Sequence, residues 1–201
     1  PIAKMSSLKV IQSPNAGVDD VIALRPAGVT LCNAAGVHDA STAELAVGLA
    51  IAARRGFSQF AKDQSAGKWS HTTFASLTDS KIAIVGHGNI GKTIAGMLAG
   101  FEVEITSFSK SGSNGAITMD KFDALLPTFD VIILIVPLNS ETRHLMNSNR
   151  LAAMKDGAAL INVARGAVVD TDALLKELQA GRISAGLDVT DPEPLPAGHP
   201  L

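Results

Sequence analysis

The sequence predicts an α/β fold in which a doubly wound parallel sheet follows a fragment of a second domain. Short apolar runs recur along the 201 residues, with helical patterns between them. The run at 131–136 is continuous and rich in β-branched residues, which is typical of a parallel strand buried on both faces. A glycine-rich turn directly follows the apolar run at 81–85. Together these patterns indicate a sheet with helices on both faces.

The first 40 residues contain two strand candidates, at 8–11 and 29–32. Two strands are too few for an independent domain, so we interpret residues 1–40 as part of a second domain. The single cysteine, Cys32, lies in the second of these runs, where it is expected to be a small buried hydrophobic residue and not a reactive thiol.

A long apolar helix is expected from about residue 43 to about residue 61, with Ser41 or Thr42 as its N-cap. We treat residues 41–62 as a linking helix at the start of a dinucleotide-binding domain that spans 41–201. The polar stretch at 67–78 is predicted to be a loop.

The core of this domain is expected at 79–190. Its strands are predicted at 81–85, 103–108, 131–135, 158–162 and 183–187. Helical patterns lie between them at 92–99, 119–126, 148–154 and 171–180, and Asp170 and Thr171 are expected to cap the last of these.

Composition excludes several classes of function. Hydrophobic residues make up 46% of the chain, which is enough for a sizeable core. The net charge is −2 and no Lys or Arg cluster stands out, so nucleic acid is not an expected partner. The apolar runs are too short to cross a bilayer. A lone cysteine fits a reducing cytoplasm, and no set of metal ligands is assigned.

The segment 81–91 reads K-I-A-I-V-G-H-G-N-I-G, a strand followed by G-x-G-x-x-G and the start of a helix. Gly86 allows a tight turn, Gly88 allows a pyrophosphate to approach the main chain, and Gly91 allows close packing of helix and strand. The N–H groups at the helix start then face the phosphates. This pattern predicts a dinucleotide site; a structural glycine turn is the alternative.

The next strand ends at Ser109 and Lys110, where NAD-binding domains commonly carry an acidic residue for the adenosine ribose. A carboxylate would repel a 2′-phosphate, whereas a hydroxyl and an ammonium group attract one. The pair therefore favours NADP(H), with NAD(H) possible. The alternative is that Lys110 is an ordinary solvated lysine.

Three polar residues follow later strands. Arg165 comes directly after the strand at 158–162, and its guanidinium suits a planar carboxylate; an ion pair with a structural carboxylate is the alternative. Asp188 ends the last strand, and Glu193 lies in a proline-rich loop beyond it. Carboxyl ends of parallel strands share one edge, where open α/β sheets bind ligands.

These motifs together resemble the D-isomer-specific 2-hydroxyacid dehydrogenases. That family carries the glycine motif, then V-P-L-x-x-x-T, I-N-x-x-R-G-x-x-V-D and D-V-x-x-x-E-P. The corresponding segments here are 136–142, 161–170 and 188–194, and residues 8–19 and 33–44 also match. The resemblance covers essentially the whole chain. It implies a Rossmann-like dinucleotide domain and a flavodoxin-like substrate domain.

The resemblance also implies roles for individual residues. Arg165 clamps the substrate carboxylate together with backbone amides near Ala16 and Gly17. Glu193 orients a catalytic histidine, which passes the proton as hydride moves to or from C2. Asp188 binds the nicotinamide carboxamide. The remaining cofactor contacts come from Gly86, Gly88, Asn89, Ile90, Gly91, Ser109, Lys110, Val136, Pro137, Thr142, Val163 and Ala164.

The family's histidine lies in a P-H-x-x-G segment beyond the D-V-x-x-x-E-P loop, and this chain stops at Leu201, before such a segment. None of its five histidines has that context, and we expect surface or local structural roles for them. We interpret the chain as the interior of a longer enzyme that is incomplete at both ends.

The leading hypothesis is an NADP(H)-preferring oxidoreductase of a small 2-keto or 2-hydroxy acid, similar to glyoxylate or hydroxypyruvate, with D specificity. The alternatives are an NAD(P)-sensing protein like the corepressors that share this fold, and a dehydrogenase of formate or phosphite. The resemblance also implies a homodimer that pairs through the apolar helix at 43–61.

Overall fold

The structure, a computed structural model, describes residues 2–201. Within them lies a fully parallel sheet with the strand order β5-β4-β3-β6-β7-β8. Its strands are β3 (Lys81–Val85), β4 (Glu104–Ser109), β5 (Ile117–Thr118), β6 (Val131–Leu134), β7 (Ala159–Asn162) and β8 (Ser184–Leu187). The strand order runs in opposite directions on the two sides of β3, which confirms the doubly wound arrangement predicted from the sequence.

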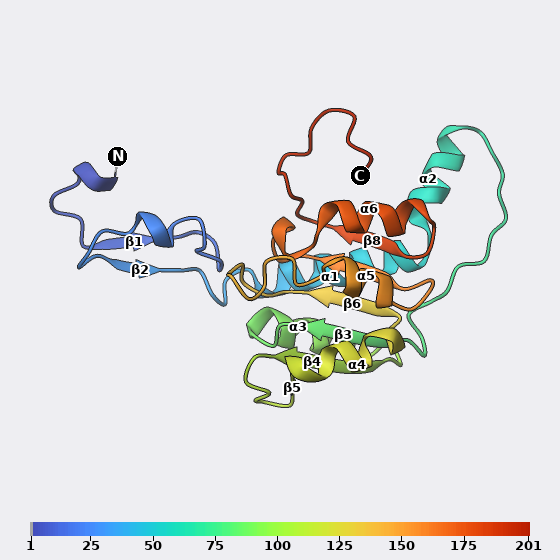
Figure 1. Ribbon diagram of the computed structural model, residues 1–201, viewed down its shortest axis with the longest axis horizontal. Coiled ribbons are helices and arrows are strands. Elements are labelled where there is room, and N and C mark those ends of the chain that lie inside the picture. The colour runs from blue at the N-terminus through green and yellow to red at the C-terminus, as the bar shows by residue number, and fades with distance from the viewer. Residues whose placement is uncertain (1) are drawn as a thin grey trace.

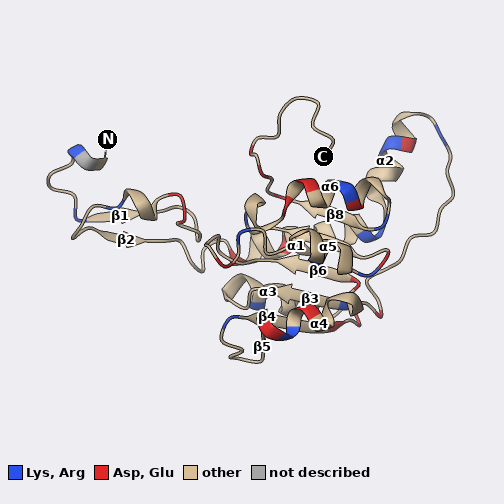
Figure 2. Ribbon diagram, viewed as in Figure 1, with Lys and Arg blue, Asp and Glu red and all other residues tan. Residues whose placement is uncertain are grey.

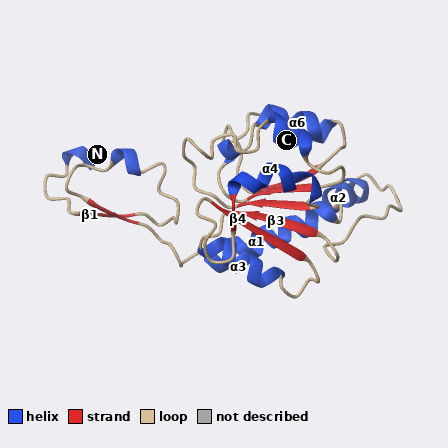
Figure 3. Ribbon diagram, turned by 60° about the horizontal axis from the view of Figure 1, so that its bottom comes forward, coloured by secondary structure: helices blue, strands red, loops and turns tan. Residues whose placement is uncertain are grey.

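Helices cover both faces of this sheet, as Figure 3 shows. The helices are α1 (Asp39–Arg54), α2 (Phe57–Ser65), α3 (Asn89–Leu98), α4 (Phe122–Leu125), α5 (Ser148–Ala153) and α6 (Thr171–Gln179). Residues of α1 and α3 pack on one face, against Ile82, Ile84 and Ile133. Residues of α4, α5 and α6 pack on the other, against Val85 and Leu134. Because side chains alternate along a strand, the continuous apolar runs supply both cores at once.

The N-terminal unit, residues 2–38, lies beside the sheet and is joined to it through the start of α1 (Figure 1). It contains two short parallel strands, β1 (Val10–Gln12) and β2 (Thr30–Cys32). The strands match the predicted positions to within two residues. Cys32 is only half-buried, so the expectation of a buried cysteine was wrong. Two paired strands lie side by side and cannot cover the faces of their own sheet. This accounts for the exposure of Cys32.

The predicted helix at 43–61 is in fact two helices. The first begins at Asp39, with His38 and not Ser41 or Thr42 as its N-cap; Ser41 lies within the helix, where its hydroxyl donates back to the His38 carbonyl. It ends at Arg54, and Gly56 takes a left-handed conformation with φ of 63° before α2 begins. A Cβ at Gly56 would overlap the ring of Phe74. The break thus falls at a glycine in the left-handed conformation, a common way for a helix to end.

The bounds of the other elements differ less from those predicted from the sequence. Helix α3 begins at Asn89 and not at 92, because the glycine motif itself supplies its first turn. The pattern at 119–126 gives a short α-helix flanked by 3-10 turns at Met119–Lys121 and Leu126–Thr128. The two-residue strand β5 was missed. Asp170 caps α6 as expected, since its side chain accepts a hydrogen bond from Ala173 N.

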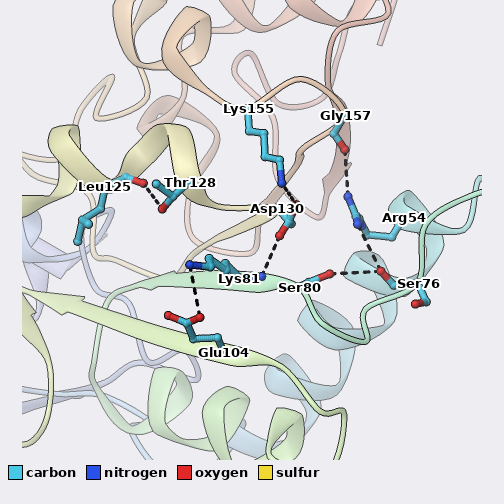
Figure 4. Close-up of polar contacts among 10 residues, drawn as sticks. All are labelled: Arg54, Ser76, Ser80, Lys81, Glu104, Leu125, Thr128, Asp130, Lys155 and Gly157. Carbon is cyan, nitrogen blue, oxygen red and sulfur yellow. Dashed lines mark hydrogen bonds and ion pairs between the residues drawn. The ribbon is translucent and has the colours of Figure 1, made fainter.

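Polar contacts tie the strands together at the amino end of the sheet (Figure 4). Asp130 accepts hydrogen bonds from the backbone N–H of Lys81 at 2.9 Å and from Lys155 Nζ at 2.7 Å. Burial by itself would raise the pKa of Asp130, but these hydrogen bonds outweigh it and hold the pKa below its usual range. On the same side, Arg54 donates to the carbonyls of Gly157 and Ser76.

Candidate functional site

The predicted site segments gather at the opposite, carboxyl edge of the sheet. The parallel strands β3, β4, β6, β7 and β8 all end there. The glycine loop follows β3, at the point where the strand order changes direction. Open α/β sheets bind ligands in the crevice at such a point.

The glycine loop has the geometry that a pyrophosphate requires. Gly86 has φ of 116°, and a Cβ there would overlap the Ile135 carbonyl. A Cβ at Gly91 would overlap the Gly86 carbonyl, so this glycine allows helix and strand to pack closely. At Gly88, by contrast, no atom of the described residues lies within 4 Å of a Cβ position. The main chain is therefore open to a ligand at that residue.

The start of α3 can supply the matching donors. Gly88 is its N-cap, and within α3 no acidic residue occupies the first turn and no side chain caps it. Of its first two residues, Asn89 is exposed and Ile90 is half-buried. The ten-residue helix thus presents uncapped N–H groups and the positive end of its dipole to the crevice. These residues fit a dinucleotide phosphate.

Ser109 and Lys110 lie at the end of β4, on one side of the glycine loop. The Ser109 hydroxyl accepts a hydrogen bond from Gly112 N at 3.0 Å, which shapes the following turn. Lys110 Nζ donates to both carboxylate oxygens of Glu141, at 2.6 and 2.8 Å. Lys110 is therefore in an ion pair, although 82% of its side chain stays accessible to solvent, as the alternative of a solvated lysine expected.

The loop after β6 lies on the other side of the glycine loop, because β6 pairs with β3. Val136 is half-buried and Pro137 is exposed. The Thr142 hydroxyl donates to the Pro137 carbonyl at 2.6 Å and accepts from Asn139 N at 2.9 Å. Thr142 thus closes this loop on itself, and its hydroxyl already has partners within the loop.

Arg165 is held by the turn that ends β7. The buried side chain of Asn162 accepts from Ala164 N at 3.0 Å and donates to the Arg165 carbonyl at 2.9 Å. Val163 and Ala164, predicted to line the cofactor groove, are themselves buried. Asn162 belongs to the I-N-x-x-R-G segment, but its residue type did not predict that its side chain would hold this turn.

The Arg165 guanidinium reaches the N-terminal unit. Its Nε donates to Asp19 Oδ2 at 3.1 Å, and its Nη2 lies 3.1 Å from Asp19 Oδ1. A Cβ at Gly17 would overlap Nη2, so the guanidinium in this position uses the space that the glycine leaves open. The structural ion pair that was the alternative for Arg165 is therefore present. It occupies the Nε–Nη2 side of the guanidinium, and Nη1 donates to the Ala164 carbonyl at 2.8 Å.

Ala16 and Gly17 lie beside Arg165 although about 150 residues separate them in the sequence. Asn33 holds their loop by donating to the Ala16 carbonyl at 2.9 Å. Among the contacts of residues 2–201, the N–H groups of Ala16 and Gly17 have no acceptor. A guanidinium and free backbone amides are a donor set that suits a carboxylate.

Asp188 and Glu193 follow β8 at the same edge, and both are exposed. Asp188 N extends the ladder by donating to the Asn162 carbonyl at 3.0 Å. Glu193 accepts a long hydrogen bond, 3.4 Å, from Thr190 N. A Cβ at Gly166 would overlap the Thr190 carbonyl, and Thr171 Oγ1 donates to the Asp191 carbonyl at 2.7 Å. The loop of Arg165 thus packs backbone to backbone against the loop of Glu193.

Three of the histidines contact main-chain groups of the described residues. His87 Nε2 lies 2.9 Å from the Asn114 carbonyl, and His38 Nε2 lies 3.2 Å from the Pro14 carbonyl. His199 Nδ1 accepts from Leu201 N. Within residues 2–201 there is no group of three His, Cys, Asp or Glu side chains that could hold a metal ion. None of the described helices is long and apolar enough for a membrane span.

Three residues without a predicted role prove central to the geometry: Asn162, Asp19 and Glu141. Each lies inside a segment that carried the family resemblance. Their contacts run between segments that are far apart in the chain, or depend on the shape of a turn. No pattern of residue types along the sequence reports such contacts.

Comparison with known proteins agrees with these observations. Residues 47–201 match the sequence profile of the D-isomer specific 2-hydroxyacid dehydrogenase NAD binding domain. A glyoxylate reductase of Thermofilum pendens is 37% identical over 97% of the chain, and a hydroxypyruvate reductase of Thermotoga maritima is 33% identical over 94%. The chain spans 62% and 64% of their respective lengths.

A solved structure shows the same architecture. It is a D-isomer specific 2-hydroxyacid dehydrogenase from Xanthobacter autotrophicus, in complex with NADPH and MES. Its TM-score with this chain is 0.85 at 30% identity, and the match covers 100% of this chain and 66% of that one.

Proposed function

Since this chain belongs to the D-isomer specific 2-hydroxyacid dehydrogenase family, we propose that it serves hydride transfer between NADP(H) and C2 of a small 2-keto or 2-hydroxy acid. One observation carries the proposal. The Arg165 guanidinium and the amides of Ala16 and Gly17 converge at the sheet edge that also carries the open glycine loop. A carboxylate donor set thus lies on the same edge as a dinucleotide cradle.

In this proposal Arg165, Ala16 and Gly17 hold the substrate carboxylate. Asp19 lies along the Nε–Nη2 side of the guanidinium and fixes its orientation. The guanidinium has five N–H groups, so donors on both Nη1 and Nη2 remain for the substrate. Charge-assisted hydrogen bonds of this kind position the carbonyl carbon C2 for reaction.

The remaining residues serve the cofactor and the proton. Gly86, Gly88, Asn89, Ile90 and Gly91 cradle the pyrophosphate. The groove on either side of it is lined by Val136, Pro137, Thr142, Val163 and Ala164, and Asp188 receives the nicotinamide carboxamide. A bound nicotinamide dinucleotide supplies or accepts the hydride. Glu193 orients the histidine that exchanges a proton with the substrate oxygen.

For the cofactor we propose NADP(H) over NAD(H). Ser109 and Lys110 offer a hydroxyl and an ammonium group where an acidic residue would bind the ribose hydroxyls of NAD. The NADPH-bound relative shows that a protein of this family can take this cofactor. For the substrate we propose an acid of the size of glyoxylate or hydroxypyruvate, because relatives named for these substrates cover most of the chain.

We also propose a homodimer. Helix α1 buries Ala43, Ala46 and Ala50 against its own sheet, yet large apolar side chains remain exposed on and after it. These are Leu45, Phe57, Phe60 and Trp69. Helix α2 and the loop after it project from the sheet (Figure 1). Pairing two copies through this region would cover the exposed residues. A monomeric mass in light scattering across micromolar concentrations would contradict it.

Turnover of the full-length protein tests the activity. The assay compares NADPH and NADH with glyoxylate, hydroxypyruvate and bulkier 2-keto acids. We expect measurable reduction of the two small acids and a higher kcat/KM with NADPH. Binding of dinucleotide without turnover of any 2-keto acid would favour a cofactor-sensing role instead. Turnover of formate or phosphite, with no turnover of a 2-keto acid, would instead favour a formate or phosphite dehydrogenase.

A further inference from the structure

The ion pair between Lys110 and Glu141 joins the two loops that flank the glycine loop. Lys110 follows β4, and Glu141 lies in the loop after β6. Strand β3 lies between these two strands, so its glycine loop lies between the paired residues. Both partners are exposed, with 82% and 62% of their side chains accessible. The pair thus bridges the two loops that flank the glycine loop, at a position open to solvent.

The backbone around Glu141 is fixed in place. Asn139 Oδ1 accepts from Glu141 N at 2.8 Å and from Thr142 N at 3.1 Å, which forms a tight polar turn. The Thr142 hydroxyl locks the same turn to the Pro137 carbonyl. The backbone that carries the Glu141 carboxylate is therefore held in place. Its contact with Lys110 does not require a flexible loop to change conformation.

Glu141 uses the very group that a 2′-phosphate would need. The ammonium of Lys110 donates to both carboxylate oxygens, so its charge is neutralised before any ligand arrives. A 2′-phosphate at Ser109 and Lys110 must take Lys110 from Glu141 and then lie near a negative charge. NAD(H) has no 2′-phosphate, so its binding requires neither the loss of the ion pair nor the approach of a second negative charge to Glu141.

We infer that Glu141 is a specificity-determining residue that competes with the cofactor 2′-phosphate for Lys110 and so limits the preference for NADP(H). The inference rests on the proposed dinucleotide function. It does not depend on which cofactor the wild-type protein prefers, because it concerns the change in preference when the carboxylate is removed.

Glu141→Gln tests it by removing the charge while keeping the shape. Binding of NADPH and NADH to this chain is followed by fluorescence at low salt. NADPH affinity is expected to rise about three- to fivefold, the upper part of the range for an exposed ion pair, and NADH affinity to change less than about twofold. The gain should shrink as salt is added. In a Lys110→Gln background, Glu141→Gln should no longer raise NADPH affinity.

Glu104→Gln is the matched control (Figure 4). Glu104 also pairs with an exposed lysine, Lys81, at 3.6 Å, and 68% of its side chain is accessible. It lies at the opposite end of β4 from Lys110, away from the crevice. The same charge change there is expected to leave the NADPH to NADH ratio within twofold of wild type.

The outcomes separate the two proposals. An unchanged ratio in Glu141→Gln, or a loss of NADPH affinity, would overturn the role of Glu141 while the dinucleotide site stands. An equal gain in Glu104→Gln would also overturn it, because the effect would then come from net charge. Failure of the wild-type chain to bind either dinucleotide would overturn the proposed function and this inference with it.

Discussion

The two units of the chain bury similar residues to very different extents. In the sheet unit, residues 39–201, the strand residues Ile82, Ile133 and Leu134 are fully buried. In the N-terminal unit, 54% of Val10 and 62% of Leu24 are exposed. Both units use short parallel strands of apolar residues, so the residue type alone does not explain the contrast.

The number of neighbouring elements explains it. A parallel strand needs cover on both faces, and the six-stranded sheet has helices on each. The N-terminal unit offers two strands and short turns. The sheet unit should therefore supply most of the free energy of unfolding. The proposed carboxylate site, by contrast, needs residues from both units. In Figure 2, ribbon segments coloured for Lys and Arg and for Asp and Glu occur in both units.

The largest predicted effect is on folding. Phe108 is fully buried in the sheet unit, with ring centroids 5.0 Å from Phe122 and 5.8 Å from Phe129. Phe108→Ala is expected to lower the free energy of unfolding by about 3–5 kcal/mol, because it leaves a cavity. Val10→Ala, in the N-terminal unit, should change it by less than about 0.5 kcal/mol. Urea unfolding measures both, and equal losses would contradict the contrast between the units.

The second prediction concerns the site between the units. Arg165→Lys in the full-length protein keeps the charge but loses the planar fork. The cost in kcat/KM for a 2-keto acid should be on the order of 2–4 kcal/mol, with little change in cofactor affinity. Asp19→Asn, on the other unit, should also lower kcat/KM, because it frees the guanidinium to rotate. Arg55→Lys, at the exposed end of α1, serves as the control. Near-wild-type kinetics for Arg165→Lys would remove its role as a carboxylate clamp.

The third prediction separates the units by their response to acid. The folded state lowers the pKa of Asp130 below its ordinary value of 3.8, so its ionised form stabilises the fold above about pH 4. That contribution disappears as the pH falls through the folded-state pKa. Asp130→Asn should cost on the order of 1–2 kcal/mol at pH 7 and progressively less toward pH 3.

Asp20→Asn is the control for this titration. Asp20 is exposed in the N-terminal unit, so the variant should change stability by no more than about 0.5 kcal/mol at either pH. Urea midpoints at both pH values provide the measurement. A cost of Asp130→Asn that stayed constant with pH would show that the carboxylate charge is not what stabilises this end of the sheet.

The smallest predicted effect is on cofactor choice, which should depend on the sheet unit alone. Ser109→Asp places a carboxylate beside the ribose and should shift preference toward NAD(H) by about 1 kcal/mol, or under tenfold. Added salt should weaken NADP(H) binding more than NAD(H) binding in the wild type. Ser7→Asp makes the same change in the N-terminal unit and should leave the ratio unaltered. Tighter binding of NADH than NADPH by the wild type at low salt would overturn the proposed preference for NADP(H).

Local sequence predicted the sheet well for a physical reason. The apolar runs are continuous, and the glycine motif requires a strand before it and a helix after it. Strand β3 was therefore found at its observed bounds, and the other long strands to within one residue. The break between α1 and α2 falls at Gly56, which takes the left-handed conformation that commonly ends a helix; it was missed because the apolar pattern at 43–61 continues through it.

The site was predictable only in part. Arg165 and the glycine loop were found because their residue types are tied to one kind of chemistry. The partners Asp19 and Glu141 were not, since an exposed acidic residue in a loop has no distinguishing pattern. Their contacts span 146 and 31 residues of sequence. Only the folded chain brings such residues within reach of each other.

The close contact between Gly166 and the Thr190 carbonyl has a consequence for protein engineering. It joins segments 163–170 and 188–196 so tightly that a change in the path of one must be matched by the other. Recombination that takes the first segment from one parent enzyme and the second from another would pair backbones that did not diverge together. A chimera with altered substrate range should therefore inherit both segments from the same parent.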